Sequence, residues 1–197
     1  CLQPMIEAIN LEGAYGRLTV FEILTVLSLV HFARKNCEFQ VMEVGMGGRF
    51  DATNVISPEV CLLTSINYDH TEVLGNTLAE ITGEKCGIIK SGCAVVSHPQ
   101  AAEAEAVIRQ TCLNKGVKLI QVGRDVTRKS LCYDLDHQEV EIRGKLDNYR
   151  VSIPLLGDYQ LDNAAAAVAA LEVLIERGYH ISREAILTGL SGVNFPG

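Results

Sequence analysis

Short apolar runs alternate with longer helical stretches along most of this chain, and that alternation limits the fold more than any other feature. Buried strands are predicted over 39–44, 60–65, 94–97 and 117–122. A strand, a helix and a second strand in succession form a βαβ unit, which places the two strands in parallel. The sequence therefore predicts an α/β fold with a mainly parallel sheet flanked by helices.

Two capping-box patterns mark where helices begin. Thr19-Val20-Phe21-Glu22 opens an apolar helix that ends near Lys35, and Thr77-Leu78-Ala79-Glu80 opens a helix that runs to about Ile89. Further helices are predicted over 100–115, over 159–177 and after Ser182. Gly116 and Gly178 fit the position just beyond a helix end.

Residues 131–153 follow a different pattern. Short alternating segments are separated there by polar turns at 134–138 and 144–148. Such spacing is typical of hairpins. We therefore expect a small antiparallel addition to the parallel sheet.

Composition excludes several classes of protein. The net charge of -7 does not fit a nucleic-acid surface, which needs clustered Lys and Arg. The most apolar stretch, 18–33, contains Glu22 and His31 and is shorter than a membrane span requires. The seven cysteines include no Cys-x-x-Cys pair, so we expect buried free thiols in a reducing, cytoplasmic compartment.

The first candidate site is the segment from Glu43 to Asn54, which follows the strand predicted at 39–44. Glycines at 45, 47 and 48 allow the backbone to approach a ligand closely, although plain turns use the same residues. Glu43 lies at an apolar strand end, where a buried carboxylate must be paired or metal-bound. An ion pair with Arg49 and a metal ligand are both open at this point.

The second candidate site follows the strand predicted at 60–65. Asp69 and His70 form an acid–imidazole pair directly after that strand. Ligands of parallel sheets bind at the carboxyl ends of the strands, where both candidate segments are expected. Lys85, in the helix that opens at Thr77, is by itself either a surface cation or a functional residue.

These segments resemble the folylpolyglutamate and dihydrofolate synthases of the Mur ligase superfamily. The resemblance is carried by the ordered motifs 43–54, 64–75 and 84–90, and it extends to 19–22, 157–160 and 163–165. Peptidoglycan ligases of the superfamily share the Asp-His element but not Gly-Gly-Arg-x-Asp-Ala-Thr-Asn.

The resemblance implies an ATP- and Mg²⁺-dependent ligase that adds L-glutamate to the γ-carboxylate of a folate, or to dihydropteroate, through an acyl phosphate. It implies that Glu43 and His70 are Mg²⁺ ligands and that His70 and Lys85 are catalytic, with Lys85 carbamylated. It places Gln160 and Asn163 at the nucleotide. It also implies a cytoplasmic protein without nucleic-acid or membrane partners, monomeric when full length.

The chain departs from the family pattern in one respect. No phosphate-binding loop of the form Gly-x-x-x-x-Gly-Lys-[Ser/Thr] occurs, and the Gly144-Lys145 pair lacks the matching glycine. In the family this loop precedes the motifs seen here, and a C-terminal domain follows them. We therefore expect residues 1–197 to be a truncated central ATP-binding domain that shows no turnover alone.

Two other functions are left open by the sequence. One is an amide ligase of the same superfamily that acts on a different carboxylate, such as a peptidoglycan precursor. The other is a binding module that lacks the phosphate-binding loop naturally. The acceptor used by the full-length protein, and the presence of that loop, distinguish these alternatives.

Overall fold

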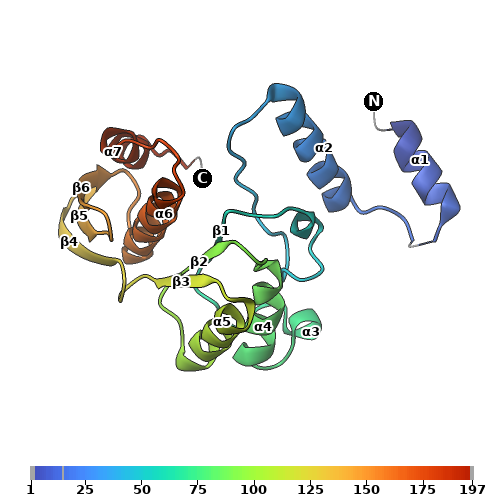
Figure 1. Ribbon diagram of the computed structural model, residues 1–197, viewed down its shortest axis with the longest axis horizontal. Helices are drawn as coiled ribbons and strands as arrows, with labels where there is room; N and C mark the ends of the chain where they lie inside the picture. Colours follow the sequence, from blue (N-terminus) through green and yellow to red (C-terminus); the bar gives the residue numbers. More distant parts are fainter. Residues whose placement is uncertain (1–2, 15, 196–197) are drawn as a thin grey trace. The chain divides into compact units, whose positions relative to one another are not determined.

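The computed structural model describes residues 3–14 and 16–195 (Figure 1). The chain divides into two compact units, Cys1–Ile56 and Ser57–Gly197.

The first unit is helical. It contains α1 (Gln3–Glu12), α2 (Val20–Lys35) and a short 3-10 helix, η1 (Ala52–Val55). The capping box predicted for α2 is confirmed: Glu22 N–H donates to Thr19 Oγ1 at 3.2 Å, and Thr19 N–H donates to the Glu22 carboxylate at 2.7 Å. Helix α2 ends, as predicted, at Lys35.

The strand predicted at 39–44 is wrong. These residues have no regular secondary structure, and Val41 is 94% exposed. A strand needs a neighbouring strand to complete its hydrogen-bonded ladder. The described part of the first unit contains no strand that could supply one.

The second unit begins with the predicted parallel sheet. Strands β1 (Val60–Leu63), β2 (Ala94–Ser97) and β3 (Lys118–Gln121) pair in parallel in the order β1-β2-β3. The segment between β1 and β2 holds α3 (Thr71–Leu74), α4 (Leu78–Lys85) and η2 (Cys86–Ile88), and α5 (Ala102–Lys115) connects β2 to β3. The α/β prediction is confirmed, and so are the Thr77 capping box and the Gly116 helix end.

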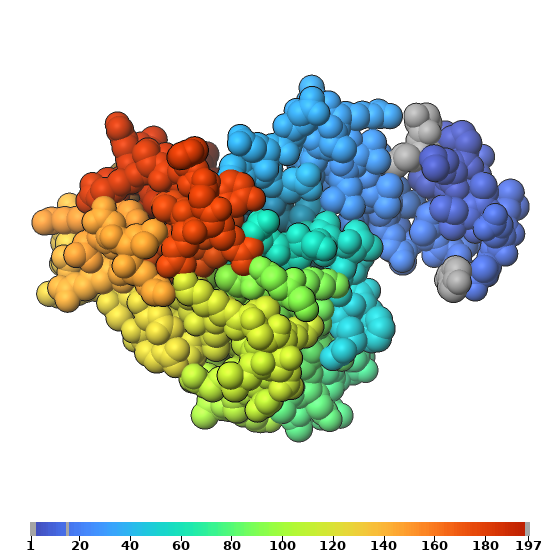
Figure 2. Space-filling model, viewed as in Figure 1, coloured from blue at the N-terminus to red at the C-terminus, as the bar shows by residue number. Residues whose placement is uncertain are grey.

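An antiparallel sheet follows, also as predicted. Strands β4 (Thr127–Tyr133), β5 (Gln138–Arg143) and β6 (Asn148–Ile153) form it in that order. The chain then forms α6 (Asp158–Glu176) and α7 (Arg183–Ser191), with Ser182 capping α7. In the space-filling view the yellow and orange antiparallel part adjoins the green parallel-sheet part (Figure 2).

Helices cover both faces of the parallel sheet. One core joins β1 and β2 to α4 and α5, and it includes Cys61, Ile81, Val95 and Ile108. The other core joins β2, β3 and the antiparallel sheet to α6. Among the described cysteines all are free, and four of them are buried: Cys61, Cys86, Cys93 and Cys112. The expectation of buried free thiols is met at these positions.

Glu172 on α6 holds the turn between β5 and β6. Glu172 is 2% exposed, and its carboxylate accepts hydrogen bonds from the backbone N–H groups of Lys145, Leu146 and Asp147 at 2.7–3.2 Å. It also accepts one from the Tyr149 hydroxyl at 3.1 Å. Burial and this negative charge raise the pKa of Tyr149 to about 12.

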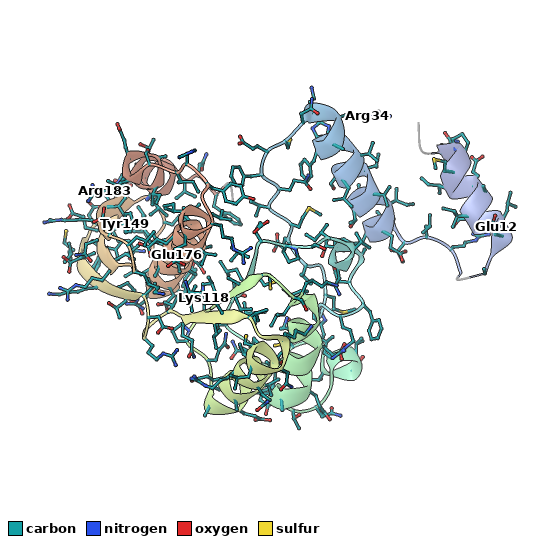
Figure 3. The ribbon with its side chains drawn as sticks, viewed as in Figure 1. Glu12, Arg34, Lys118, Tyr149, Glu176 and Arg183 are labelled. Atoms are coloured by element: carbon teal, nitrogen blue, oxygen red, sulfur yellow. The ribbon has the colours of Figure 1, made fainter. Side chains whose placement is uncertain are left out.

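The approach of Glu172 to the turn requires glycine at position 144. A Cβ there would meet the Glu172 carboxylate at 2.1 Å. Figure 3 shows Tyr149 and Arg183 together at this end of the antiparallel sheet, and the Arg183 guanidinium lies 6.0 Å from the centre of the Tyr149 ring. Glu172 therefore holds the turn itself, and Arg183 packs on Tyr149, which follows the turn.

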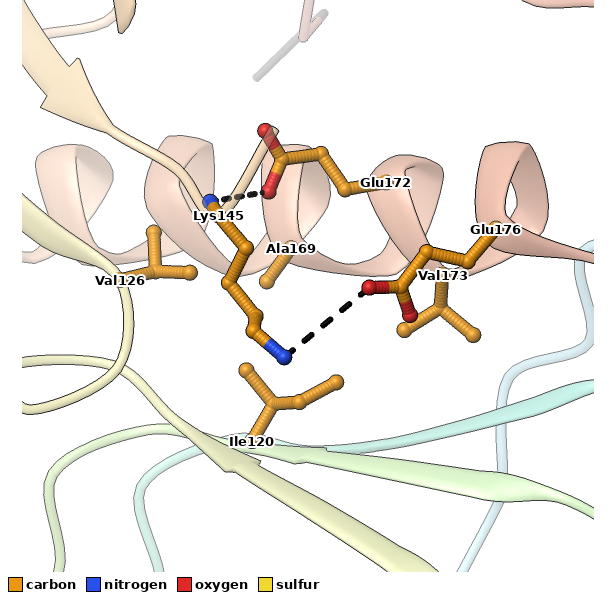
Figure 4. Close-up of a pocket in the computed structure, with 7 residues that line it drawn as sticks. All are labelled: Ile120, Val126, Lys145, Ala169, Glu172, Val173 and Glu176. Atoms are coloured by element: carbon orange, nitrogen blue, oxygen red, sulfur yellow. Dashed lines mark hydrogen bonds and ion pairs between the residues drawn. The ribbon is translucent and has the colours of Figure 1, made fainter. Parts of the chain in front are cut away.

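A shallow hollow beside Glu172 is not a ligand site. Lys145 and Glu176 lie in it with apolar neighbours (Figure 4). The Lys145 ammonium lies 3.9 Å from the Glu176 carboxylate, which also pairs with Lys118. The polar groups of the hollow already have partners within the chain.

No helix in the part of the chain that the structure describes is long and apolar enough to cross a membrane.

Replacing Glu172 by alanine should destabilise the second unit. The change leaves three part-buried backbone N–H groups and the buried Tyr149 hydroxyl without their acceptor, which should lower the free energy of unfolding by about 3–5 kcal/mol. Urea unfolding followed by circular dichroism measures it. Glu184→Ala is the control, because Glu184 is exposed on α7 and its loss should change stability by less than about 0.5 kcal/mol. Equal stabilities of the two variants would contradict the role given to Glu172.

Candidate active site

Helix α6 runs against the direction of the parallel strands. At its C-terminal end Arg177 bonds to the Glu59 carboxylate and, at 2.7 Å, to the Gly92 carbonyl. Glu59 directly precedes β1, and Gly92 lies just before β2, so this end of the helix is at the amino edge of the sheet. Because α6 packs along β1 and β2, its N-terminal end lies at the carboxyl edge, where parallel sheets bind ligands.

The structure brings Gln160 and Asn163 together at that N-terminal end. The Asn163 side-chain amide donates to Gln160 Oε1 at 2.9 Å. Asn163 is exposed and Gln160 is half-buried. The two residues predicted to contact a nucleotide therefore form one polar pair on the first turns of α6.

Arg128 on β4 fixes these turns. Its guanidinium makes two hydrogen bonds to Asp158, at 2.8 and 2.6 Å, and one to Asp162 Oδ1 at 3.0 Å. These hydrogen bonds raise the pKa of Arg128, with Asp158 as the larger contributor. Sequence reasoning missed this clamp, because Arg128 lies far from α6 in the sequence.

Gln100 fixes the segment that leaves β1 at the same edge. Its side chain accepts from the Ile66 N–H at 3.0 Å and donates to the Thr64 carbonyl at 2.9 Å. Sequence reasoning treated Gln100 only as a helix start. A glutamine three residues beyond the end of the buried strand β2 was the available signal.

His70 lies beyond this clamped segment, at the start of α3. It has a left-handed backbone conformation, with φ of 49°, which is uncommon for a residue other than glycine. The Asp69 carboxylate accepts from the His70 N–H at 2.9 Å and lies 3.6 Å from His70 Nε2. The imidazole is 54% exposed, so it is accessible to a ligand.

Lys85 is the last residue of α4 and is half-buried. Within the part of the chain that the structure describes, its ammonium has no hydrogen bond or ion pair. A half-buried lysine without such a partner is compatible with both a surface cation and a functional residue, so the structure leaves both interpretations of Lys85 open. Its placement beside His70, and its carbamylation, stay predictions.

In the first unit, Asp51 organises the loop that follows Glu43. Its carboxylate accepts from the N–H groups of Gly45 and Met46, both at 3.0 Å, and from that of Thr53 at 2.9 Å. Partial burial works to raise the pKa of Asp51, but the hydrogen bonds outweigh it and hold the pKa below its usual value. The loop is therefore built around an internal carboxylate, which the sequence analysis did not anticipate.

Glu43 does not lie at the buried strand end predicted from the sequence. It was expected at a buried strand end, but it is exposed and lies outside any strand. The ion pair with Arg49 is not formed, and Glu43 has no other ion pair within residues 3–14 and 16–195. Its carboxylate is therefore free to bind a cation.

The donor set fits Mg²⁺ only in part. Among the described residues there is no group of three or more His, Cys, Asp or Glu side chains that could hold a metal ion. Mg²⁺ commonly takes one or two protein ligands and completes its octahedron with water and phosphate oxygens. The exposed Glu43 carboxylate of the first unit fits that mode by itself, and the exposed His70 imidazole of the second unit is accessible to a ligand by itself.

Asp51→Asn should loosen the loop locally. An amide cannot accept hydrogen bonds at all the positions where the carboxylate does, so the N–H groups of Gly45 and Met46 should exchange with solvent about tenfold faster. Hydrogen exchange measured by NMR at neutral pH checks this. In the wild type the carboxylate contributes fully above the unfolded pKa of about 3.9 and loses its effect as the pH falls through the lower folded value.

Asp134→Asn is the matched control for this change. Asp134 accepts from the N–H groups of Asp136 and His137, both at 2.8 Å, in the turn between β4 and β5. Its loss should speed exchange in that turn and leave Gly45 unchanged. Unchanged exchange at Gly45 in Asp51→Asn would contradict the proposed organisation of the loop.

Comparison with known proteins identifies the family. The Mur ligase middle domain matches residues 4–171. The dihydrofolate synthase/folylpolyglutamate synthase of Bacillus subtilis is 35% identical, over all of this chain and 46% of the relative. The dihydrofolate synthetase of Saccharomyces cerevisiae is 32% identical, over all of this chain and 45% of the relative. The chain thus spans about half the length of the curated relatives it matches.

Solved structures agree with this match. The folylpolyglutamate synthase of Lactobacillus casei in apo form superposes with a TM-score of 0.92 at 30% identity, over 99% of this chain and 48% of that one. A folylpolyglutamate synthase in a complex with AMPPCP and folate gives the same TM-score, identity and coverage. The Mycobacterium tuberculosis enzyme, complexed with ADP and AMPPCP, gives 0.91 at 29% identity, over 100% of this chain and 45% of that one. The chain belongs to the Mur ligase family and is matched by that family's middle domain over residues 4–171.

Proposed function

We propose that the full-length protein is an ATP- and Mg²⁺-dependent ligase that joins L-glutamate to the γ-carboxylate of a folate, or to dihydropteroate. The observation that carries this proposal is the carboxyl edge of the parallel sheet. The Gln160–Asn163 pair lies there on α6, and the exposed His70 follows the clamped end of β1. The similarity to a structure that contains AMPPCP and folate supports both substrate classes.

The proposed reaction has two steps. The γ-carboxylate of the folate attacks the γ-phosphorus of ATP, and the bond from that phosphorus to the β–γ bridging oxygen breaks to release ADP. The amine of glutamate then attacks the acyl phosphate, loses a proton and displaces phosphate to form an amide. Both steps need fixed groups that bind and orient anions.

Residues of this chain would divide that task. Glu43 and His70 would bind Mg²⁺, which when bound supplies positive charge next to the phosphate oxygens. Gln160 and Asn163 would orient the nucleotide from the first turns of α6. Lys85 would act as a carbamate, because the carbamate converts a half-buried cation into an anion suited to a metal-rich site.

The metal ligands can be tested by replacement in the full-length protein. Glu43→Ala and His70→Ala should each lower kcat by about a hundredfold or more, because each removes charge or a ligand from phosphoryl transfer. Product formation from ATP, glutamate and a panel of acceptors measures it, and circular dichroism checks the fold. His137→Ala is the control, since His137 is exposed in the turn between β4 and β5. Wild-type turnover in either test variant would remove that residue from the site.

The same panel tests the proposed function itself. Turnover with folates or dihydropteroate supports it. Turnover only with a peptidoglycan precursor would favour another ligase of the superfamily, and nucleotide-independent binding without turnover would favour a binding module.

Lys85 has a more specific test. Lys85→Ala should lose activity, and short carboxylic acids added to the reaction should restore part of it, because they place an anion where the carbamate stood. Lys115→Ala is the matched control, since Lys115 ends α5 and bonds to the Ile89 carbonyl. It should keep near-normal activity and show no response to the added acids. Full activity of Lys85→Ala without acid would show that no carbamate is needed.

A further inference from the structure

His98 is buried directly beyond β2. It is 4% exposed, and its N–H donates to the Leu63 carbonyl at 2.9 Å, which extends the pairing of β1 and β2 by one residue. Alternate residues of a strand face opposite sides of the sheet. Val96 belongs to the core that includes Leu161 and Ala165 of α6, so His98, two residues further on, lies on the α6 face.

One ring nitrogen of the His98 imidazole lacks a hydrogen bond within the described part of the chain. Its Nε2 atom is buried and has no partner among the described residues. Buried polar atoms in folded proteins are almost always bonded to protein or to ordered water. Burial lowers the pKa of His98, so the ring is neutral at physiological pH and presents one donor and one acceptor nitrogen.

Asp162 on α6 is the charged group that acts on this ring, and it works to raise the pKa of His98. Asp162 is held in turn by Arg128 on β4. The two oxygens of Asp162 are held unequally: Oδ1 lies 3.0 Å from Arg128 Nε, whereas Oδ2 lies 3.4 Å from Nη2. The second oxygen therefore has capacity for another partner.

We propose that His98 is a positioning residue that ties the first turns of α6 to the carboxyl end of β2, through a bridging water between its Nε2 and the Asp162 carboxylate. A buried water that joins two polar groups is a common way of satisfying such atoms. Gln160 and Asn163 occupy the same turns, so the tie fixes the height and rotation of the pair above the sheet. The consequence for nucleotide binding rests on the function proposed above, but the tie itself does not.

The tie can be tested without any activity. Removing the negative charge by Asp162→Asn should lower the pKa of His98 further, and NMR titration of the ring nitrogens measures this. Asp136→Asn is the control, because Asp136 is exposed in the turn between β4 and β5 and should leave His98 unchanged. An unchanged His98 titration in Asp162→Asn would overturn the proposal.

The functional consequence is tested in the full-length protein. His98→Leu should raise KM for ATP about fivefold to tenfold, with kcat and KM for the folate within about twofold of wild type. His98→Gln, whose amide reaches a similar point, should restore most of the affinity for ATP. His180→Leu is the control, because His180 is exposed.

Each outcome has a defined meaning. An unchanged KM for ATP in His98→Leu, or an equal rise in the KM values for ATP and for the folate, would overturn the proposal that His98 positions the first turns of α6. If His98→Leu does not fold, His98→Gln and the titration decide. Absence of ligase turnover in the wild type would remove the proposed function, and the titration in Asp162→Asn would still decide whether the tie exists.

Discussion

The arrangement of the second unit depends on the close packing of α6 between two sheets. Small residues make this possible: the buried side chains of α6 include Ala164, Ala165, Ala166 and Ala169, which lie on more than one face of the helix. Short side chains let the helix backbone approach both sheets while larger neighbours such as Val168 fill the remaining space. Polar anchors then fix the helix along its axis, with Arg128 near its start, Glu172 in its last turns and Arg177 at its end. The polar pair at the head of the helix is placed by contacts along its whole length.

Local signals in the sequence predicted most of the fold of this unit. The Thr77 capping box is satisfied by hydrogen bonds between residues three positions apart, so the pattern alone specifies the geometry. The strand at 94–97 was predicted at its observed bounds because it is an uninterrupted apolar run bounded by a turn. The mostly apolar run at 39–44 was interpreted in the same way, but it forms no strand. A strand depends on a partner elsewhere in the chain, and no local pattern reports whether that partner exists.

The candidate site was predictable to a smaller degree. The motifs identified His70, Gln160 and Asn163, and α6 places the last two in contact. The groups that hold them in position, Arg128 and Gln100, were not identified. Their hydrogen bonds join residues far apart in the sequence, and an arginine or glutamine is equally common on an open surface. Sequence patterns indicate candidate ligand-binding residues more readily than the residues that support them.

Hydrogen bonding separates the acidic residues of this chain into two groups that the sequence could not distinguish. The carboxylates of Asp51 and Glu172 accept hydrogen bonds from backbone N–H groups. Asp51 thereby fixes the loop after Glu43, and Glu172 fixes the turn between β5 and β6. Glu43 and Asp69 keep exposed oxygens with no cation bound from the described chain beyond the neighbouring His70. A carboxylate that is already saturated with N–H donors gains little from a metal ion, because binding would break those bonds. The sequence placed Glu43 and Asp51 in the same glycine-rich motif, but their environments differ: the Asp51 carboxylate accepts hydrogen bonds from the loop backbone, whereas the Glu43 carboxylate, at the start of the loop, is exposed and has no ion pair among the described residues.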